Sequence, residues 1–354
     1  MSIFPTQYST LSAIALKDFL SEKYNLKNAN CRLLIHNVSD TYLLEDLQSK
    51  YIFKIYRDQH RKLPEIKAEV ELLNILHLRG VKVSYPLEDV NAEQIQSFNA
   101  AEGMRYGVLF SYAKGEPVYA MSDQQLELVG KEMALFHEVA SSIELSYPRK
   151  EYNLDTLLIK PLALIKPAFE HLEDEYEYLV NTSKKVAAGM MNIDAEKFSY
   201  GYCHYDFLPK NFHFDGGEGL TFFDFDFVGK GFLINDISSF YVHFFLEVLH
   251  GKITQEEADR SFRVFIKAYR SVRVLRDEEL DAIPYFGFAF WVFYLGFHFE
   301  NFEDCSSQIF GPRYIKGVVG FLKKWMEWLN GLQIRSSNDR EKISRSAGWL
   351  TQCS

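Results

Sequence analysis

The chain has 354 residues, 47% of them hydrophobic and 25% charged, so it is long enough and apolar enough to bury a substantial core. Its formal net charge of −9 at pH 7 argues against a broad nucleic-acid-binding surface. The four cysteines lie far apart and form no Cys-x-x-Cys pair, which disfavours both a disulfide framework and a zinc site. Because the N-terminus also lacks the pattern of a secretory signal, we expect a cytoplasmic protein with reduced thiols.

Strand signals dominate the first third of the chain. Two apolar runs in "CRLLIHNVSDTYLL" are separated by a polar turn, and "YIFKIY" (Tyr51 to Tyr56) is a further β-rich run. Alternation along this strand places Lys54 on the same face as Ile52 and Tyr56. The pattern therefore predicts a lysine that points into a partly apolar cleft.

A helix is predicted after Pro64. The apolar positions Ile66, Val70, Leu73 and Leu76 recur at helical spacing, and Glu69 falls inside their stripe. A carboxylate on an inward face needs a partner, and Lys54 is the natural candidate. Glu65, one turn earlier, is the alternative if the helix boundary is misjudged.

The segment "RYGVLFSYAKGEP" is typical of a strand that runs into a Gly/Pro-bounded turn. We interpret residues 111–116 as a hinge between an N-terminal lobe, residues 1–110, and a C-terminal lobe, residues 117–333. Residues 334–354 are polar and are predicted to form a loose tail.

The pattern His-x-Asp-x-x-x-x-Asn occurs once in a segment rich in phenylalanine, at His204, Asp206 and Asn211. It resembles the catalytic loop of kinases, in which the aspartate accepts the proton of the acceptor hydroxyl and the asparagine holds magnesium. A carboxylate from the next strand would complete the hard-oxygen ligand set that magnesium prefers, and Asp224 has the right position. Asp226 could add a metal contact or cap a neighbouring turn. His204 is assigned to the catalytic segment, where it would brace the loop.

Taken together, these segments resemble the aminoglycoside phosphotransferase and choline kinase superfamily, roughly from Cys31 to Leu329. "GYCHYDFLPKNFHF" and "TFFDFDFVGKGFLINDIS" are similar to its catalytic and metal segments, and the carboxy-terminal helices are similar to those of homoserine-kinase-like members and stress-response kinases. The resemblance implies an α+β, bilobal, protein-kinase-like fold. The small N-lobe would be β-rich with one main helix, and the large lobe mostly helical with a catalytic hairpin.

The resemblance also implies ATP and Mg²⁺ as cofactors and transfer of the γ-phosphoryl group to a hydroxyl. Lys54 and Glu69 would contact the nucleotide, together with Ser39, Phe110 and Tyr112. Two departures from related sequences are visible. The glycine-rich loop of protein kinases is absent, with the polar turn in "HNVSDTYLL" in its place, and Lys210 occupies a position where relatives commonly carry glycine.

Aromatic residues are concentrated between Tyr285 and Phe299, a run of 15 residues that is too short for a membrane span and predicts a buried helix. Trp291, Tyr294 and His298 share one face of it. This stripe is either core or one wall of an acceptor pocket, since aromatic faces bind cations. We therefore expect an amino alcohol, hydroxy amino acid or aminoglycoside-like acceptor. We also expect no nucleic-acid or membrane partner, and a monomer or homodimer.

Three alternatives remain open on the sequence. A Ser/Thr protein kinase would use the same residues on a protein acceptor. A metallohydrolase would use His204, Asp206, Asp224 and Asp226 as ligands, but such sites usually contain more histidines. A catalytically inactive kinase-like binding module is not indicated, because every expected acid is present.

Overall fold

The computed structural model describes residues 4–216, 219–301 and 310–328. The chain separates into two compact units. One comprises Met1–Tyr152 and Ser199–Val274, and the other comprises Asn153–Phe198, Leu275–Glu300 and the helix at 312–328. The predicted lobes, residues 1–110 and 117–333, do not coincide with these two units. The division of the chain into two functional lobes stays a prediction. The predicted tail at 334–354 lies outside the described residues.

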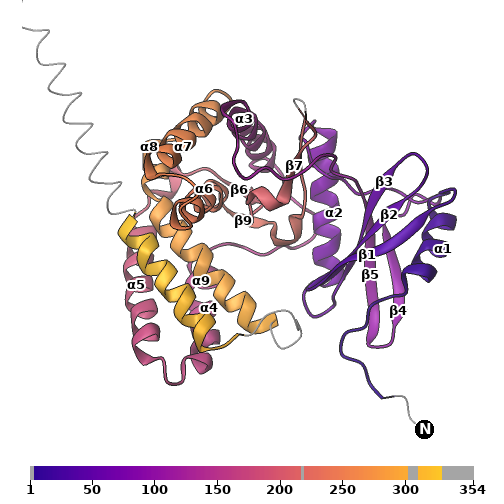
Figure 1. The fold of residues 1–354 in the computed structure, drawn as a ribbon, viewed down its shortest axis with the longest axis horizontal. Helices are drawn as coiled ribbons and strands as arrows, with labels where there is room; N and C mark the ends of the chain where they lie inside the picture. Colours follow the sequence, from indigo (N-terminus) through magenta and orange to yellow (C-terminus); the bar gives the residue numbers. More distant parts are fainter. Residues whose placement is uncertain (1–3, 217–218, 302–309, 329–354) are drawn as a thin grey trace, which may run out of the picture. The chain divides into compact units, whose positions relative to one another are not determined.

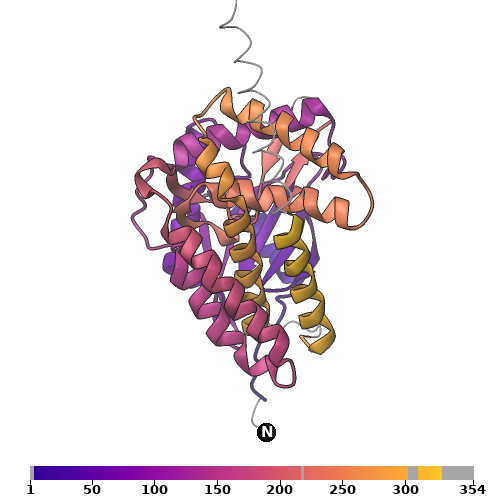
Figure 2. The same cartoon turned by 90° about the vertical axis from the view of Figure 1, so that its left-hand side faces the viewer.

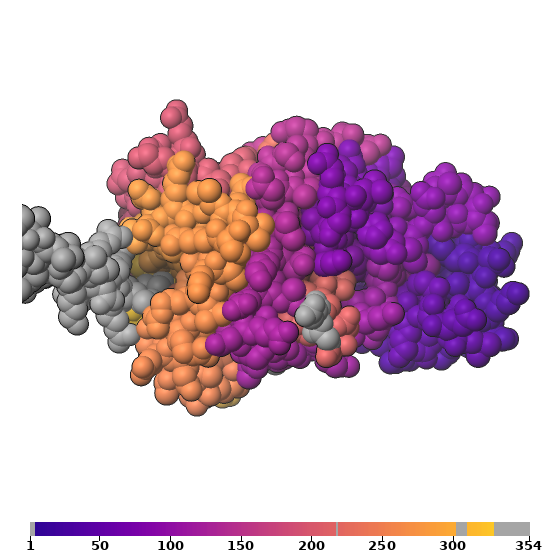
Figure 3. Space-filling model, turned by 90° about the horizontal axis from the view of Figure 1, so that it is seen from above, coloured from indigo at the N-terminus to yellow at the C-terminus, as the bar shows by residue number. Residues whose placement is uncertain are grey.

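The first unit contains an antiparallel sheet in the spatial order β1-β2-β3-β5-β4 (Figure 1). Its strands are β1 (Asn30–His36), β2 (Ser39–Glu45), β3 (Lys50–Tyr56), β4 (Ile95–Ala100) and β5 (Gly103–Ser111). In the space-filling view the indigo and violet atoms of this N-terminal part lie together (Figure 3). The predicted polar turn is confirmed, since the chain reverses between β1 and β2 at residues 37–38.

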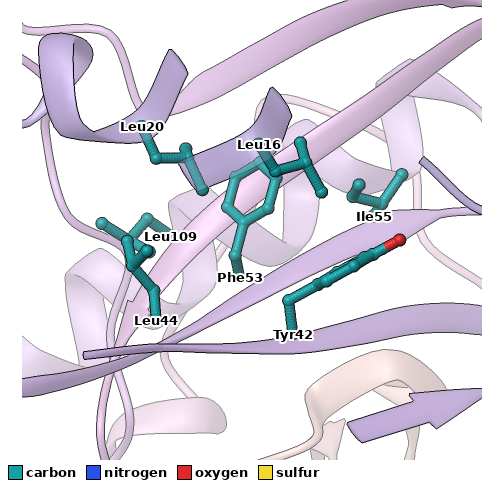
Figure 4. Close-up of a cluster of buried hydrophobic side chains, with 7 residues drawn as sticks. All are labelled: Leu16, Leu20, Tyr42, Leu44, Phe53, Ile55 and Leu109. Carbon is teal, nitrogen blue, oxygen red and sulfur yellow. The ribbon is translucent and has the colours of Figure 1, made fainter. Parts of the chain in front are cut away.

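One face of the sheet is covered by α1 (Ala13–Lys23), as Figure 4 shows. The buried side chains of this cluster are Leu16, Leu20, Tyr42, Leu44, Phe53, Ile55 and Leu109. Burying each large apolar side chain contributes roughly 1.5–3 kcal/mol. Because Phe53 and Ile55 point toward α1, alternation directs Lys54 to the opposite face, as the sequence predicts.

Helix α2 (Leu63–Leu78) follows β3, with Pro64 in its first turn. The predicted stripe is buried and includes Glu69, whose exposed fraction is only 1%. Glu65 instead accepts a hydrogen bond from the backbone N–H of Lys62 at the start of the helix. The helical register inferred from the apolar stripe is therefore confirmed.

The remainder of the first unit contains the segments around the His-x-Asp-x-x-x-x-Asn motif. Two short antiparallel pairs join β6 (Tyr200–Cys203) to β9 (Gly229–Phe232) and β7 (Phe212–Phe214) to β8 (Leu220–Phe222). The helices of this part are α3 (Asp123–Ala140), α6 (Ile234–Leu249) and α7 (Gln255–Arg270). Helix α3 approaches α7 closely at Gly130, where an added Cβ would lie 2.5 Å from the carbonyl oxygen of Phe265.

The second unit is helical. It contains α4 (Lys160–Ile165), α5 (Glu173–Met191), α8 (Asp277–Asp281), α9 (Ile283–Asn301) and the helix at 312–328. Helices α5 and α9 and the helix at 312–328 lie side by side in both views (Figures 1 and 2). The indole N–H of Trp325 donates to the carbonyl of Pro284, which ties the last of these helices to α9. The buried aromatic helix predicted from the sequence is thus confirmed.

None of the described helices combines the length and the apolar character that a membrane crossing requires. The predicted fold class is confirmed: an antiparallel sheet at the N-terminus is followed by a larger, mainly helical part.

Candidate active site

The predicted catalytic loop lies between β6 and β7 and is held by Asp236 of α6. The carboxylate of Asp236 accepts hydrogen bonds from the backbone N–H groups of His204 (2.8 Å) and Tyr205 (2.7 Å). The imidazole of His137 lies 3.1 Å from the same carboxylate. His204 in turn contacts the carbonyl of Phe223 through Nε2, at 2.9 Å. These contacts give His204 the bracing position that the sequence predicts.

Two residues of the site have left-handed backbone conformations. Tyr205 has φ 71° and Asp224 has φ 62°, values that cost energy for residues other than glycine. The ring of Tyr205 stacks on that of Tyr152 with centroids 3.8 Å apart, and its N–H is bound to Asp236. The surrounding contacts therefore stabilise an unfavourable backbone next to Asp206.

Asp206 is buried, with an exposed fraction of 3%, and its two carboxylate oxygens have different surroundings. Oδ2 accepts a hydrogen bond from Asn211 (2.8 Å) and forms an ion pair with Lys210 (2.7 Å). Oδ1 has no hydrogen-bond partner among the described residues. A buried, unpartnered acceptor costs free energy, so this oxygen is suited to accept a hydrogen bond from a bound hydroxyl.

Asn211 links the loop to the next strand. Its amide nitrogen donates to both the backbone carbonyl and the carboxylate of Asp206, which directs the amide oxygen away from that residue. Its own backbone carbonyl accepts from the N–H of Phe223, at 2.9 Å. Asn211 is thus fixed next to the residue that precedes Asp224.

Asp224 forms an ion pair with Lys54 of β3. Its Oδ1 lies 2.9 Å from Nζ of Lys54, while the side chain as a whole remains 48% exposed. The surrounding protein favours a higher pKa for Asp224, but the ammonium of Lys54 outweighs this effect and lowers it. For Lys54, burial favours a lower pKa, and the carboxylates of Asp224, Asp226 and Glu69 together raise it. Both groups are therefore charged at neutral pH.

The predicted pairing of Lys54 with Glu69 differs from what the structure shows. The ion pairs of Lys54 are with Asp224 and, at 3.8 Å, with Asp226. Glu69 accepts a hydrogen bond from the hydroxyl of Tyr56 (3.0 Å) and lies 3.5 Å from the guanidinium of Arg149. Glu69 still acts on Lys54 through its charge, although other groups make the direct contacts.

The carboxylate of Asp226 lies among one histidine and two cationic side chains, those of Lys54 and Arg61. Its carboxylate lies 2.6 Å from Nε2 of His60 and 3.3 Å from Nε of Arg61. Burial favours a higher pKa for Asp226, but His60, Lys54 and Arg61 hold it well below its usual range. The guanidiniums of Arg61 and Arg149 also donate to its backbone carbonyl. These contacts favour the turn-stabilising role over a metal contact for Asp226.

The three remaining nucleotide-contact predictions lie near Lys54 on the sheet. Strand pairing sets Ser39 opposite Tyr56 and Phe110 opposite Ile52, so both share the face of Lys54. Tyr112 follows directly after β5, and Nζ of Lys50 lies 5.8 Å from the centre of its ring. The sheet therefore gathers these side chains on or beside one face, and their contact with a nucleotide stays a prediction.

The predicted hinge segment contains Gly115, which has φ 88°. A Cβ at this position would lie 1.9 Å from the carbonyl oxygen of Phe214, so only glycine fits here without rearrangement. The backbone of Glu116 pairs with that of Phe214 in both directions. The segment is thereby attached to β7, immediately after Asn211.

The aromatic stripe lies on α9, in the second unit. The indole of Trp291 packs against Phe321 with ring centroids 4.4 Å apart, and His298 contacts the hydroxyl of Tyr314 at 2.5 Å. Nε1 of Trp291 is buried and has no hydrogen-bond partner among the described residues. Tyr294 packs against Phe290. These contacts are compatible both with core packing and with one wall of an acceptor pocket, and the acceptor-binding role stays a prediction.

Three functional neighbours were missed by sequence reasoning: His60, Arg61 and Arg149. The first two lie in "DQHRK", directly before α2, where a basic pair next to a strand lysine could have indicated a buried acid. Arg149 follows a proline outside any periodic pattern and donates to the carbonyls of Val228 and Phe225. No sequence signal marks it.

The donor set fits a hard divalent cation and a nucleotide. An amide oxygen on Asn211 and the half-exposed carboxylate of Asp224 are the ligands that Mg²⁺ prefers, and Lys54 is a suitable phosphate partner. A transition-metal hydrolase would need a cluster of His, Cys, Asp or Glu ligands. Among the residues that the structure describes, no group of three or more such side chains could hold a metal ion.

Comparison with known proteins identifies the family of this chain. The sequence profile described as "Phosphotransferase enzyme family" matches residues 31–275. A curated but uncharacterised protein of Synechocystis is 32% identical over 286 residues, covering 79% of this chain and 77% of its own. The chain therefore belongs to the phosphotransferase enzyme family.

Solved structures of small-molecule kinases share the fold. An amicoumacin kinase, solved in complex with AMP-PNP, Ca²⁺ and Ami, has a TM-score of 0.71 at 19% identity, and the match covers 90% of this chain and 93% of the kinase. A microcompartment-associated aminopropanol kinase also has a TM-score of 0.71, at 18% identity, with 90% and 97% covered. The family profile confirms the superfamily inferred from the catalytic motifs, and these structures show that the fold is shared.

Proposed function

We propose that this protein is an ATP- and Mg²⁺-dependent kinase that phosphorylates a hydroxyl of a small, amine-bearing molecule. The observation that carries the proposal is the carboxylate of Asp206. One of its oxygens is fixed by Asn211 and Lys210, and the other is buried without a partner. This arrangement suits a group that orients a hydroxyl and takes up its proton.

In this mechanism the acceptor hydroxyl donates a hydrogen bond to Oδ1 of Asp206. The acceptor oxygen forms a bond to the γ-phosphorus as the bond from that phosphorus to the β–γ bridging oxygen breaks. The electron pair of the broken bond leaves with ADP, and the hydroxyl proton passes to Asp206. Asp236 and His204 hold the loop so that Asp206 needs little reorganisation during the step.

The nucleotide would be held from the sheet side. Lys54 is fully charged and mostly buried, so its attraction for phosphate is weakly screened. Asn211 and Asp224 would hold Mg²⁺, which neutralises charge on the phosphates when bound. Ser39, Phe110 and Tyr112 are the proposed further contacts of the nucleotide.

The amine preference rests on two kinds of support. Trp291 and Tyr294 offer aromatic faces, to which ammonium groups bind. The relatives in the same fold include proteins named as kinases of aminopropanol and amicoumacin. We therefore place amino alcohols ahead of neutral sugars as acceptors.

The test is a screen with γ-labelled ATP and Mg²⁺ across amino alcohols, hydroxy amino acids, aminoglycosides, neutral sugars and a generic protein substrate. We expect label to be transferred to one amine-bearing class. Transfer only to protein would establish the Ser/Thr kinase alternative, and transfer only to a neutral sugar would remove the amine preference. If ATP is not consumed with any acceptor, the kinase assignment is wrong.

A further inference from the structure

Lys210 carries a charge next to Asp206, and the mechanism above uses it only to hold that carboxylate. Its side chain is 51% exposed, yet Nζ lies 2.7 Å from Oδ2 of Asp206. Burial favours a lower pKa for Lys210, but the charges of Asp206 and Asp224 both act on it and raise it. The ammonium is therefore close enough to interact with both acids of the site.

The ion pair with Lys210 is not needed to orient Asp206. Asn211 already donates to the same oxygen, at 2.8 Å, and is itself fixed by a second hydrogen bond to the backbone of Asp206. A long, half-exposed side chain also loses rotamer entropy when it is held in one ion pair. A second role for this ammonium would explain why a cation is placed here.

Lys210 lies next to Asp206, where negative charge on the phosphoryl group would have to be stabilised during transfer. A transferring phosphoryl group spreads charge over three equatorial oxygens, with the attacking and leaving oxygens roughly in line. Asp206 marks the attacking side in the proposed mechanism, and Asp224 marks the metal side. A flexible cation that is paired with Asp206, on the attacking side, can reach the group that is transferred there.

Other cations around these acids are held by the protein. The guanidinium of Arg61 is buried and donates to the backbone carbonyl of Asp226, and so does that of Arg149. The ammonium of Lys54 is bound to Asp224 on a buried side chain. Among these four side chains, Lys210 alone is half exposed, and its flexible four-carbon stem lets the ammonium move by a few ångströms.

We propose, building on the function proposed above, that Lys210 is a catalytic residue whose ammonium leaves Asp206 and contacts the transferring phosphoryl group. In that step the lysine keeps its proton and donates a hydrogen bond to an equatorial oxygen. The acceptor proton still goes to Oδ1 of Asp206, and the electron pair still leaves with ADP. The contact is stronger in the transition state than in the ground state, so it lowers the barrier.

The experiment measures nucleotide binding by calorimetry and needs no known acceptor. ADP with Mg²⁺ is compared with ADP, Mg²⁺ and aluminium fluoride, which mimics the planar phosphoryl group. Lys210→Met should weaken binding of the aluminium fluoride complex by about 10- to 100-fold, the value of a hydrogen bond to a charged group, and leave ADP binding within about twofold. Lys210→Arg should retain most of the affinity, since it keeps a charged donor.

A matched control is Lys230→Met. Lys230 of β9 also forms a lysine–carboxylate pair, with Nζ 2.8 Å from Glu144, and neither residue is one of the proposed site residues. Both binding constants should be unchanged in this variant. Thermal unfolding of all variants checks that each is folded.

A double-mutant cycle with Asp206→Asn separates direct contact from an effect through Asp206. If Lys210 contacts the phosphoryl group, Lys210→Met weakens aluminium fluoride binding in the Asp206→Asn background as well. The proposal is overturned if that loss disappears in this background, if Lys210→Met binds the complex like wild type, or if ADP binding falls equally.

Failure of the underlying function gives a different result. A wild-type protein that binds ADP no better with aluminium fluoride than without, and consumes no ATP, removes the kinase proposal and this inference with it. A wild-type protein that binds the complex tightly, alongside an indistinguishable Lys210→Met variant, removes the role of Lys210 alone.

Discussion

Two buried charge clusters of the first unit contrast in how completely their polar atoms are paired. Around Asp40, the hydroxyl of Tyr8 donates to Oδ1 at 2.8 Å, His36 lies 2.6 Å from the same atom, and Arg105 donates to Oδ2 at 3.1 Å. Around Asp206, one oxygen is paired and the other has no partner within the described part of the chain. Both carboxylates are nearly fully buried.

The difference indicates which cluster stabilises the fold and which does chemistry. A fully paired buried carboxylate offers no free atom to a ligand, whereas an unpaired one has a free energy to gain from binding. Arg105 also donates to the carbonyl of Ser9, which ties the N-terminal segment to the sheet. The Asp40 cluster is therefore structural, although its residues lie next to the turn that replaces a glycine-rich loop.

The largest expected effect is on the incompletely paired cluster. Asp206→Asn keeps the shape of the side chain but removes the proton acceptor, so turnover should fall by about two to four orders of magnitude. Because Asp206 does not bind the nucleotide in the proposed mechanism, the dissociation constant for Mg²⁺-ATP should change little. Steady-state kinetics and calorimetry measure the two quantities. Unchanged turnover would remove Asp206 from the mechanism.

The paired cluster should respond in stability instead. Arg105→Met leaves the Asp40 carboxylate buried without its guanidinium, which should lower the free energy of unfolding by about 3–5 kcal/mol. The turnover of the folded fraction should stay near that of wild type. Urea unfolding checks the first value, and Lys62→Met, which breaks an exposed pair with Asp58, is a control expected to cost less than about 1 kcal/mol. A loss of turnover with full stability would contradict the contrast between the clusters.

The same contrast recurs over two residues in the Asp-Phe-Asp segment. Asp224 is half exposed and bound to one lysine, whereas Asp226 is buried among His60, Arg61 and Lys54. Asp224→Ala should weaken Mg²⁺-ATP binding by about 100-fold or more, since a charged metal ligand is worth several kcal/mol. Asp226→Asn should mainly lower stability. Calorimetry and unfolding on both variants test this, and equal nucleotide affinity in Asp224→Ala would refute the metal assignment.

Substitution of Lys54 tests the cation that pairs with both Asp224 and Asp226. Lys54→Met keeps the packing of the stem and deletes the charge, so the Michaelis constant for ATP should rise by about 10-fold and turnover should fall. Glu69→Gln should have a smaller effect, because Tyr56 and Arg149, not Lys54, make the direct contacts of Glu69. If Glu69→Gln reproduces the whole Lys54 defect, the indirect role of Glu69 is wrong.

Local sequence pattern was sufficient to predict part of this site. The spacing of His204, Asp206 and Asn211 is set within one loop, so the short hydrogen bonds between Asn211 and Asp206 follow from chain proximity. The inward position of Glu69 follows from the helical stripe of α2. The face of Lys54 follows from strand alternation.

Pairing between distant segments was not predictable in the same way. His60 and Asp226 are 166 residues apart, and only the tertiary fold brings them together. Lys54 likewise pairs with Asp224, 170 residues away, while Glu69 lies next to Arg149, a residue outside any periodic pattern. A single sequence contains the charges of this network but not their partners.

The smallest expected effect is that of a substitution in the second unit, on α9. This helix carries both a paired and an unpaired polar group. On α9, the imidazole of His298 is bonded to Tyr314, while the buried indole nitrogen of Trp291 has no partner among the described residues. Trp291→Leu removes the aromatic face and keeps an apolar side chain. If an acceptor ammonium stacks on the indole, the Michaelis constant for the acceptor should rise by about 3- to 30-fold, with that for ATP unchanged. Kinetics with the best acceptor of the screen measure both constants, and thermal unfolding is the control. A variant that loses stability but keeps its acceptor constant would identify the stripe as core packing.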